Sequence, residues 1–178
     1  MLKKSLIALV AVLAILYAVI SSQPPSFTIS RSTVIAASPA AVFGLVNDFH
    51  QWDAWSPWAK LDPAMKKGYE GAPSGVGAIY TWSGNNDVGE GRMTITDSAP
   101  NDHIGIKLDF LRPMAVTNTA AFTFKPEGNS VGVTWSVAGD KNFVQKAFFL
   151  VMNMDKMLGA DLEKGLAQLK VLAEAAPK

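Results

Sequence analysis

Few side chains in this sequence have the types and spacing that catalysis requires. His50 and His103 are its only histidines, and neither belongs to a motif that supplies a nucleophile or a metal ligand. Cysteine is absent, as are the nucleophile-elbow, zinc-protease, phosphate-loop and dinucleotide-binding motifs. We therefore predict that both histidines are surface residues, and we assign no catalytic residue, no metal ligand and no cofactor.

One polar pair could still move protons inside an apolar cavity. Asn118 shares its strand parity with Phe122, so its amide is expected to face inward, where it must orient a ligand or bond to the backbone. Tyr80 is the second candidate. Neither residue has a sequence neighbour that would tune it for proton transfer, so the chain is expected to bind a ligand rather than to catalyse a reaction.

Apolar and aromatic side chains could line a cavity for a hydrophobic ligand. Methionine adapts to irregular apolar shapes, which suits a pliable cavity wall. The alternative is an ordinary core, because an apolar stripe is more often packing than a ligand site. The candidate ligand-binding residues are Trp55, Tyr80, Trp82, Met93, Phe110, Asn118, Phe122, Trp135, Phe148, Met152 and Met154.

A block of tryptophans, Trp52, Trp55 and Trp58, recurs at every third residue. In the structural interpretation these side chains fill the junction between short helices and a sheet, with each indole N–H bonded to a nearby carbonyl. The alternatives are a pocket mouth, a membrane-surface contact or a hot spot for a protein partner. The last of these requires the block to be exposed as one contiguous patch.

The elements that must position these residues are a strand series and short helices. Phe27 to Ala36 has the β-branched alternation of a first strand. Ser38-Pro39 and Ser56-Pro57 each resemble a helix start, the second helix being residues 57–61. An antiparallel meander is expected over residues 78–138. The glycine pairs in residues 75–77 and 89–91 predict bulges or tight bends.

The stretch from Asn142 to Ala176 is expected to be one long amphipathic helix, because apolar residues recur there at three-and-four spacing without a proline. From Phe143 to Leu158 nearly the whole circumference is apolar, whereas a polar face begins at Asp161. We expect the sheet to grip the second half, where Gly165 permits close approach. The first half is where we expect the sheet to stand off and leave room for a ligand.

Composition limits the classes of function. The chain has 178 residues, of which 49% are hydrophobic and 17% charged, enough for one packed domain and a short appendage. The formal net charge is +1 without a basic stripe, which argues against a nucleic-acid partner. Composition indicates no particular protein partner.

The N-terminal segment has the pattern of a signal-anchor or signal peptide. Lys3 and Lys4 precede the apolar run from Leu6 to Ile20, and Pro24-Pro25 follow it. We expect residues 1–22 to be a transmembrane or signal segment, 23–26 a linker and 27–178 one domain. An uncleaved single-pass anchor with the domain on the extracytoplasmic side is favoured, and export after cleavage is the alternative.

Three separated blocks resemble one protein family. NDFHQWDAWSPWAKLDP (residues 47–63), YEGAPSGVGAIYTWSGNNDVGEGRMTI (69–95) and MNMDKMLGADLEKGL (152–166) are similar to bacterial SRPBCC proteins of the polyketide cyclase/dehydrase and lipid transport type. The resemblance implies an α+β helix-grip fold (START/Bet v 1-like). In this fold a curved antiparallel sheet wraps a long C-terminal helix, and two short helices follow the first strand. It also implies a cavity between sheet and helix that holds a lipophilic ligand.

The sequence therefore predicts a membrane-tethered or exported domain that binds a hydrophobic small molecule or lipid. A polyketide cyclase or hydratase using polar groups in the same cavity is the alternative. A protein-interaction module using the tryptophan block is the second alternative.

Overall fold

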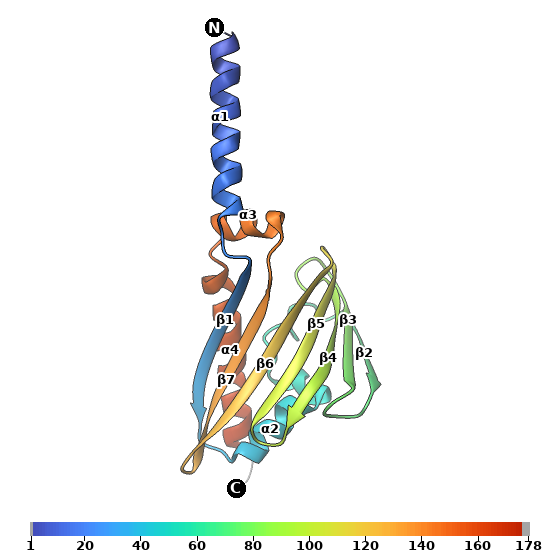
Figure 1. The fold of residues 1–178 in the computed structure, drawn as a ribbon. Coiled ribbons are helices and arrows are strands. Elements are labelled where there is room, and N and C mark those ends of the chain that lie inside the picture. The colour runs from blue at the N-terminus through green and yellow to red at the C-terminus, as the bar shows by residue number, and fades with distance from the viewer. Residues whose placement is uncertain (1, 176–178) are drawn as a thin grey trace.

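The computed structural model describes residues 2–175, and its centre is a seven-stranded antiparallel sheet (Figure 1). Met1 and residues 176–178, which include the expected helix end at Ala176, lie outside the described part. The strand order is β1-β7-β6-β5-β4-β3-β2. The strands are β1 (Ser26–Ile35), β2 (Lys66–Gly71), β3 (Ala78–Ser83), β4 (Glu90–Ala99), β5 (His103–Arg112), β6 (Val116–Glu127) and β7 (Ser130–Asp140).

The helices that pack on the sheet lie on one of its faces. The long helix α4 (Met154–Ala175) runs along β1, and α2 (Pro39–Asn47) lies at the end of the sheet far from the N-terminal helix (Figure 1). Leu162, Leu166 and Leu169 of α4 are at most 2% exposed and belong to the core. This is the predicted α+β helix-grip fold, in which a curved sheet buries its inner face against the C-terminal helix.

The short helices after β1 differ in part from the prediction. Ser38 caps α2 as expected, its hydroxyl accepting from Ala41 N at 3.2 Å. The next helix is the 3-10 helix η1 (Phe49–Ala54), whose first turn is capped by Asp48. The helix predicted at residues 57–61 is wrong. Those residues form turns, because Pro63 leaves too few positions for helical hydrogen bonding to become cooperative.

The predicted single C-terminal helix is also wrong, because it is broken into α3 (Phe143–Val151) and α4. Met152 is extended, with φ −109° and ψ 127°, and the Asn153 side chain accepts from Lys156 N at 2.9 Å. Asparagine competes for backbone N–H groups in this way and starts a new helix. The apolar pattern runs through the break without a proline, so the periodicity gave no sign of it.

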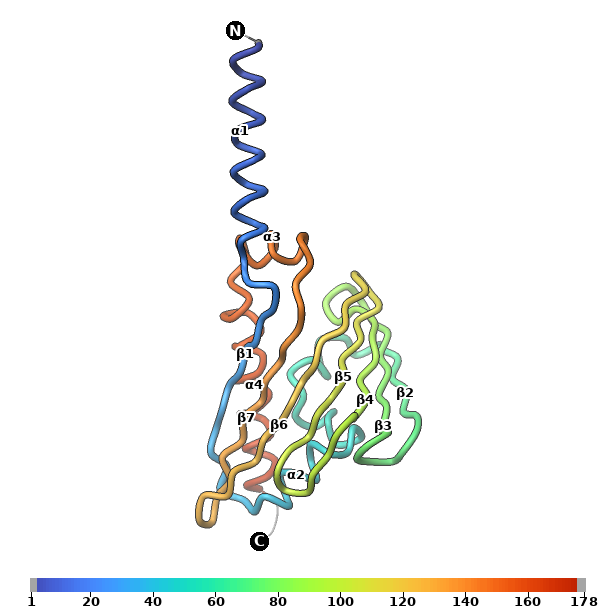
Figure 2. The backbone as a smooth tube through the Cα atoms, viewed as in Figure 1, coloured from blue at the N-terminus to red at the C-terminus, as the bar shows by residue number. Residues whose placement is uncertain are grey.

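The N-terminal helix α1 (Leu2–Ser21) stands clear of the sheet and meets the rest of the chain at α3 (Figure 2). Tyr17 stacks on Phe143 with ring centroids 5.3 Å apart, and Lys146 Nζ donates to Ser21 O at 3.2 Å. Ile20 is only 6% exposed. The last turn of α1 is therefore held against α3, and α3 lies across its end (Figure 1).

Strand β2 was missing from the prediction, and the expected glycine bends are present. β2 is an exposed edge strand of sequence KKGYEG, which lacks the apolar alternation by which strands are recognised. Gly75, Gly77 and Gly89 have φ of +71°, +88° and +66°, and the β4–β5 register shifts between Glu90 and Gly91. The predicted bends and bulge are therefore confirmed.

Gly165 provides a test of the packing between α4 and the sheet. A Cβ added at Gly165 would lie 2.6 Å from Trp135 Cζ3, whereas one added at Gly44 in α2 would meet nothing within 4 Å. We expect Gly165→Ala to lower the free energy of unfolding by about 1–3 kcal/mol, because a packed ring must move. Gly44→Ala should raise it by up to about 1 kcal/mol through helix propensity. Thermal unfolding of both variants in detergent, followed by near-ultraviolet circular dichroism, checks this; a Gly165→Ala protein as stable as Gly44→Ala would contradict it.

Candidate functional site

Six residues form one row across the inner face of the sheet, at the end nearest α1. Each pairs with the next through the strand register, and each is half-buried. We call this set the upper row. Its members, from β3 through β4, β5, β6 and β7 to β1, are Tyr80, Met93, Leu108, Asn118, Gly139 and Phe27.

The next inward-facing row, two residues along each strand, is fully packed. We call it the lower row, and no member is more than 5% exposed. Its members are Ile95, Ile106, Ala120, Val137 and Ile29, again paired through the register. The hydrophobic core therefore ends between the two rows, and the sheet continues beyond it with an apolar inner face that is only partly covered.

Asn118 is the polar member of the upper row. Its Oδ1 is buried and accepts no hydrogen bond from any residue that the structure describes. Gly139 leaves room for this amide, because a Cβ there would collide with Asn118 Oδ1 and lie 3.1 Å from Phe27 Cε1. A buried acceptor without a donor costs free energy, so Asn118 is placed to receive a hydrogen bond from a bound molecule.

Aromatic residues stand at the β3 end of the row. Tyr80 and Trp82 stack with centroids 6.0 Å apart, and Trp82 meets the edge of Phe110 at 5.8 Å. Trp82 Nε1 donates to Val88 O at 3.0 Å, which fixes the indole against the β3–β4 loop. Burial, and secondarily the charge of Asp53, raise the pKa of Tyr80 well above its ordinary value. Its phenol therefore stays neutral and can donate a hydrogen bond to a ligand.

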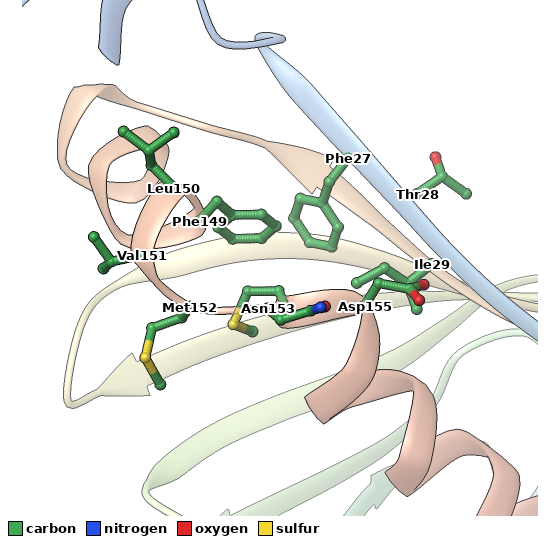
Figure 3. Close-up of a pocket in the computed structure, with 10 residues that line it drawn as sticks. Phe27, Thr28, Ile29, Phe149, Leu150, Val151, Met152, Asn153 and Asp155 are labelled. Atoms are coloured by element: carbon green, nitrogen blue, oxygen red, sulfur yellow. The ribbon is translucent and has the colours of Figure 1, made fainter. Parts of the chain in front are cut away.

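A pocket of about 530 Å³ lies at the other end of the row (Figure 3). Phe27, Thr28 and Ile29 of β1 form one wall, and residues 149–155 of the α3–α4 junction form the other. Phe149 points toward Phe27 across this space, and their ring centroids are 5.0 Å apart. The break between α3 and α4 thus lies in the wall of this space beside β1.

Arg31 holds the start of α4 beside this pocket. Its Nε donates to Glu163 Oε1 at 2.6 Å, and its Nη2 donates to the carboxylate of Asp155 at 3.1 Å and to the Asp155 carbonyl at 3.0 Å. A Cβ at Gly159 would collide with the guanidinium. These contacts raise the pKa of Arg31 and lower that of Asp155, first through their mutual hydrogen bond. The fork geometry fixes α4 on β1 while α3 turns away.

The sequence-predicted ligand residues divide into three groups. Tyr80, Met93 and Asn118 lie in the upper row, with Trp82, Phe110 and Met154 near it. Trp55, Phe122 and Trp135 are at most 2% exposed and lie in the core, with Phe122 and Trp135 stacked at 4.8 Å. Phe148 and Met152 lie at the α3 end and are 48% and 36% exposed. Ligand contact by each of these residues stays a prediction.

Two of the three tryptophans of the block have the contacts that the structural interpretation expected, and the third, Trp58, is half-buried with its ring centroid 5.6 Å from that of Trp135. Trp52 Nε1 donates to Val46 O at 2.9 Å, and Trp55 Nε1 donates to Leu45 O at 3.1 Å, as the structural interpretation expected. Trp52 is 5% exposed and Trp55 is fully buried. The block is therefore not a contiguous exposed patch, and the interaction-module alternative loses the feature that it required.

Sequence reasoning missed part of the site. Phe27, Leu108 and Gly139 of the upper row were not among the predicted ligand-binding residues, and neither were Phe149 and Arg31. The parity that placed Asn118 inward could have found Leu108, which lies two residues before Phe110 on the same strand. Nothing in the sequence could have indicated the Arg31 contacts, because they join residues 124 and 132 positions apart.

The helix α1 has the length and composition of a membrane span. It contains 20 residues, about 30 Å at 1.5 Å per residue, which matches the hydrocarbon thickness of a bilayer. Its apolar side chains are largely exposed, from Leu6 to Val19. This helix, near the N-terminus, is long and apolar enough to span a membrane or to act as a signal sequence.

One known protein family matches most of this chain. The sequence profile described as "Polyketide cyclase / dehydrase and lipid transport" matches residues 26–174. The chain belongs to this family. The SRPBCC resemblance of the three sequence blocks is thus confirmed, and the match covers the sheet, the short helices and nearly all of α4, but not α1.

Solved structures show the same family fold at low sequence identity. Protein CV1439 from Chromobacterium violaceum is 14% identical with a TM-score of 0.60, over 86% of this chain and 100% of its own. The Aha1 dimer from Colwellia psychrerythraea is 15% identical with a TM-score of 0.60, over 85% and 99%. Ara h 8.0201 is 10% identical with a TM-score of 0.58, over 85% and 99%. No functionally curated protein matches the chain.

The two histidines and the acidic side chains form no cluster near the upper row in the part of the chain that the structure describes. Among the described residues, no group of three or more histidine, cysteine, aspartate or glutamate side chains could hold a metal ion. His103 lies at the end of β5 far from the upper row and is 38% exposed at its side chain, and His50 is 52% exposed. Both histidines are therefore surface residues, as predicted.

His103 gives a prediction about pH. Its Nδ1 lies 2.8 Å from Asp102 Oδ2 and its Nε2 lies 2.7 Å from Asp97 Oδ2, and these bonds raise the pKa of His103 above its ordinary value of 6.5. The imidazolium should therefore stabilise the fold fully below pH 6.5, and this contribution should be lost as the pH rises through the folded-state pKa. NMR titration should show that Asp97→Asn lowers the pKa of His103. An unchanged titration would mean that the carboxylate does not stabilise the charged ring.

Proposed function

We propose that this chain is a membrane-tethered domain that binds a lipophilic small molecule or lipid against the upper row. The acyl or ring portion of the ligand lies along Met93, Leu108 and Phe27, and a polar group of the ligand donates to Asn118. α1 crosses the membrane with Lys3 and Lys4 in the cytoplasm, so that the domain is extracytoplasmic.

The observation that carries this proposal is the abrupt increase in side-chain exposure from the lower row to the upper row. The upper row lies near one end of each strand, and the strands continue for one to four residues beyond it. Here a register-matched row of six inward-facing residues lies only half-covered, immediately next to a row that is at most 5% exposed. Such a surface is apolar, concave and adjacent to a pocket, which is the usual character of a site for a hydrophobic ligand.

The polar groups at this site suit recognition of a ligand. The buried Asn118 Oδ1 offers an acceptor, and the neutral phenol of Tyr80 offers a donor. These two residues are separated by three strand spacings, roughly 14 Å along the sheet at about 4.8 Å per strand. An extended ligand with two polar groups could meet both of them, whereas a proton relay between them could not form directly.

Binding is tested first by identifying what the protein carries. The full chain is extracted from its own membrane in mild detergent and measured by native mass spectrometry. We expect a co-purifying lipophilic mass, released on denaturation. If none appears, and a panel of fatty acids and phospholipids leaves the tryptophan fluorescence unchanged, the binding proposal fails. Turnover of the bound compound into a new mass would instead favour the cyclase alternative.

Asn118→Leu separates a ligand-binding role from a structural one. Leucine has nearly the same shape but removes the amide, so affinity for the co-purified compound should fall roughly tenfold through loss of one buried hydrogen bond. The free energy of unfolding should not fall, because Asn118 Oδ1 accepts no hydrogen bond from the residues that the structure describes. Thr123→Val, on the outer face of the same strand, is the control and should change neither quantity. Unchanged affinity in Asn118→Leu would contradict the assignment.

The side of the membrane on which the domain lies is tested with a single cysteine that replaces Val76. The chain has no cysteine of its own, and Val76 is 58% exposed on a loop of the domain. A membrane-impermeant maleimide should label Val76→Cys in intact cells as completely as in lysed cells. Labelling that requires lysis would place the domain in the cytoplasm and overturn the proposed topology.

A further inference from the structure

The helix α3 exposes most of its apolar side chains and turns its polar side chains toward the rest of the chain. A helix on the surface of a water-soluble domain usually does the reverse. Phe148 is 48% exposed, Val144 61% and Val151 79%, and no residue of α3 is buried. The side that faces the domain carries Gln145, Lys146 and Phe149, all half-buried. Packed surface helices normally show the opposite arrangement, with the polar side chains in water.

Something apolar must therefore cover the outer side of α3. On a free domain, a contiguous patch of this kind would promote aggregation, so it marks a contact with a partner or a membrane. Figure 3 shows Leu150 and Val151 directed away from Phe27, while Phe149 is directed toward it. The outward side chains are Phe143, Val144, Phe148, Leu150 and Val151.

The position of α3 relative to α1 identifies what covers it. Tyr17 and Ser21 in the last turns of α1 contact Phe143 and Lys146 of α3, and α3 lies across the end of α1 (Figure 1). A span of 20 residues ends at the edge of the hydrocarbon layer, where tyrosine is favoured. Because α3 is fixed to this end, it lies at the depth of the lipid headgroups.

We propose that α3 is an interfacial helix, lying in the plane of the bilayer with its apolar side inserted among the lipids of the leaflet where α1 ends. Amphipathic helices with aromatic and aliphatic side chains on one face lie at this depth. Lys146 Nζ donates to Ser21 O at 3.2 Å and Lys141 Nζ lies 4.9 Å from the Phe149 ring centroid, so both ammonium groups lie at the junction of α1 and α3, at the depth where headgroups are expected. The inference rests on the membrane tether of the proposed function.

A second apolar point lies at the same end of the sheet. Leu111 and Met114, at the tip of the β5–β6 connection, are 55% and 46% exposed. This tip and α3 both lie at the end of the sheet from which α1 emerges (Figure 1). The upper row adjoins both points, because Leu108 lies on β5 three residues before Leu111 and Phe27 contacts Phe149 of α3. On this proposal the open part of the ligand site lies next to the membrane surface.

The test uses spin labels on single cysteines in the full chain, reconstituted in phosphatidylcholine vesicles. The three positions are valines exposed to similar degrees: Val10 in α1, Val151 in α3 and Val171 in α4, at 58%, 79% and 71%. Accessibility of each nitroxide to oxygen, which partitions into lipid, is compared with accessibility to a water-soluble nickel complex. We expect the oxygen-to-nickel ratio at Val151→Cys to be several-fold above that at Val171→Cys and to approach that at Val10→Cys.

Each other outcome contradicts the proposal in a distinguishable way. A ratio at Val151→Cys equal to that at Val171→Cys, with a high ratio at Val10→Cys, means that α1 spans the bilayer but α3 stays in water. Low ratios at all three positions mean that the tether itself is absent. Low accessibility to both reagents at Val151→Cys, with spin–spin broadening that disappears on dilution with unlabelled protein, means that a second copy of the chain covers α3.

Discussion

The close approach of α4 to the sheet is the contact on which the rest of the structure depends. Gly165 brings the helix backbone against the Trp135 ring, and Gly159 brings it against the Arg31 guanidinium. No larger residue could occupy either position without moving its neighbour. The helix therefore lies close against β1, at one edge of the sheet. Met93 and Leu108 lie on β4 and β5, farther across the sheet from that edge.

The Arg31 contacts extend this constraint to the end of the helix. They join β1 to Asp155 in the first turn of α4 and to Glu163 two turns later. The start of α4 is therefore held against β1 as well as its middle. Surface ion pairs contribute little stability by themselves, and the importance of these lies in their geometry. Since α4 cannot shift, the residues before it must change direction. The extended Met152 and the Asn153 cap provide the turn, and the Phe27 pocket is its consequence.

Much of this arrangement could be predicted from the sequence, because it depends on periodicity and local caps. The alternation of Val131, Val133 and Trp135 predicted a strand with one buried face, and Ser38-Pro39 predicted the start of α2. The break at Asn153 could not be predicted in this way. Residues 143–158 are mostly apolar, and this pattern fits a continuous helix buried on two sides as well as two helices of which the first exposes its apolar side chains. Tertiary contacts of Arg31 and α1 decide between these, and neither leaves a trace in local spacing.

The same difficulty explains why some of the predicted ligand-binding residues lie in the core and others lie at its edge. Hydrophobicity identifies the inward face of a strand, but it does not show where along that face the helix stops. Trp135 and Asn118 are both inward-facing residues of neighbouring strands, yet the helix covers one and leaves the other at the edge of the core. The strand register connects Asn118 to Gly139 and Phe27, and the Phe149 ring connects Phe27 to α3. The Phe27–Phe149 contact therefore joins α3 to the upper row, a connection between distant residues that no local pattern in the sequence indicates.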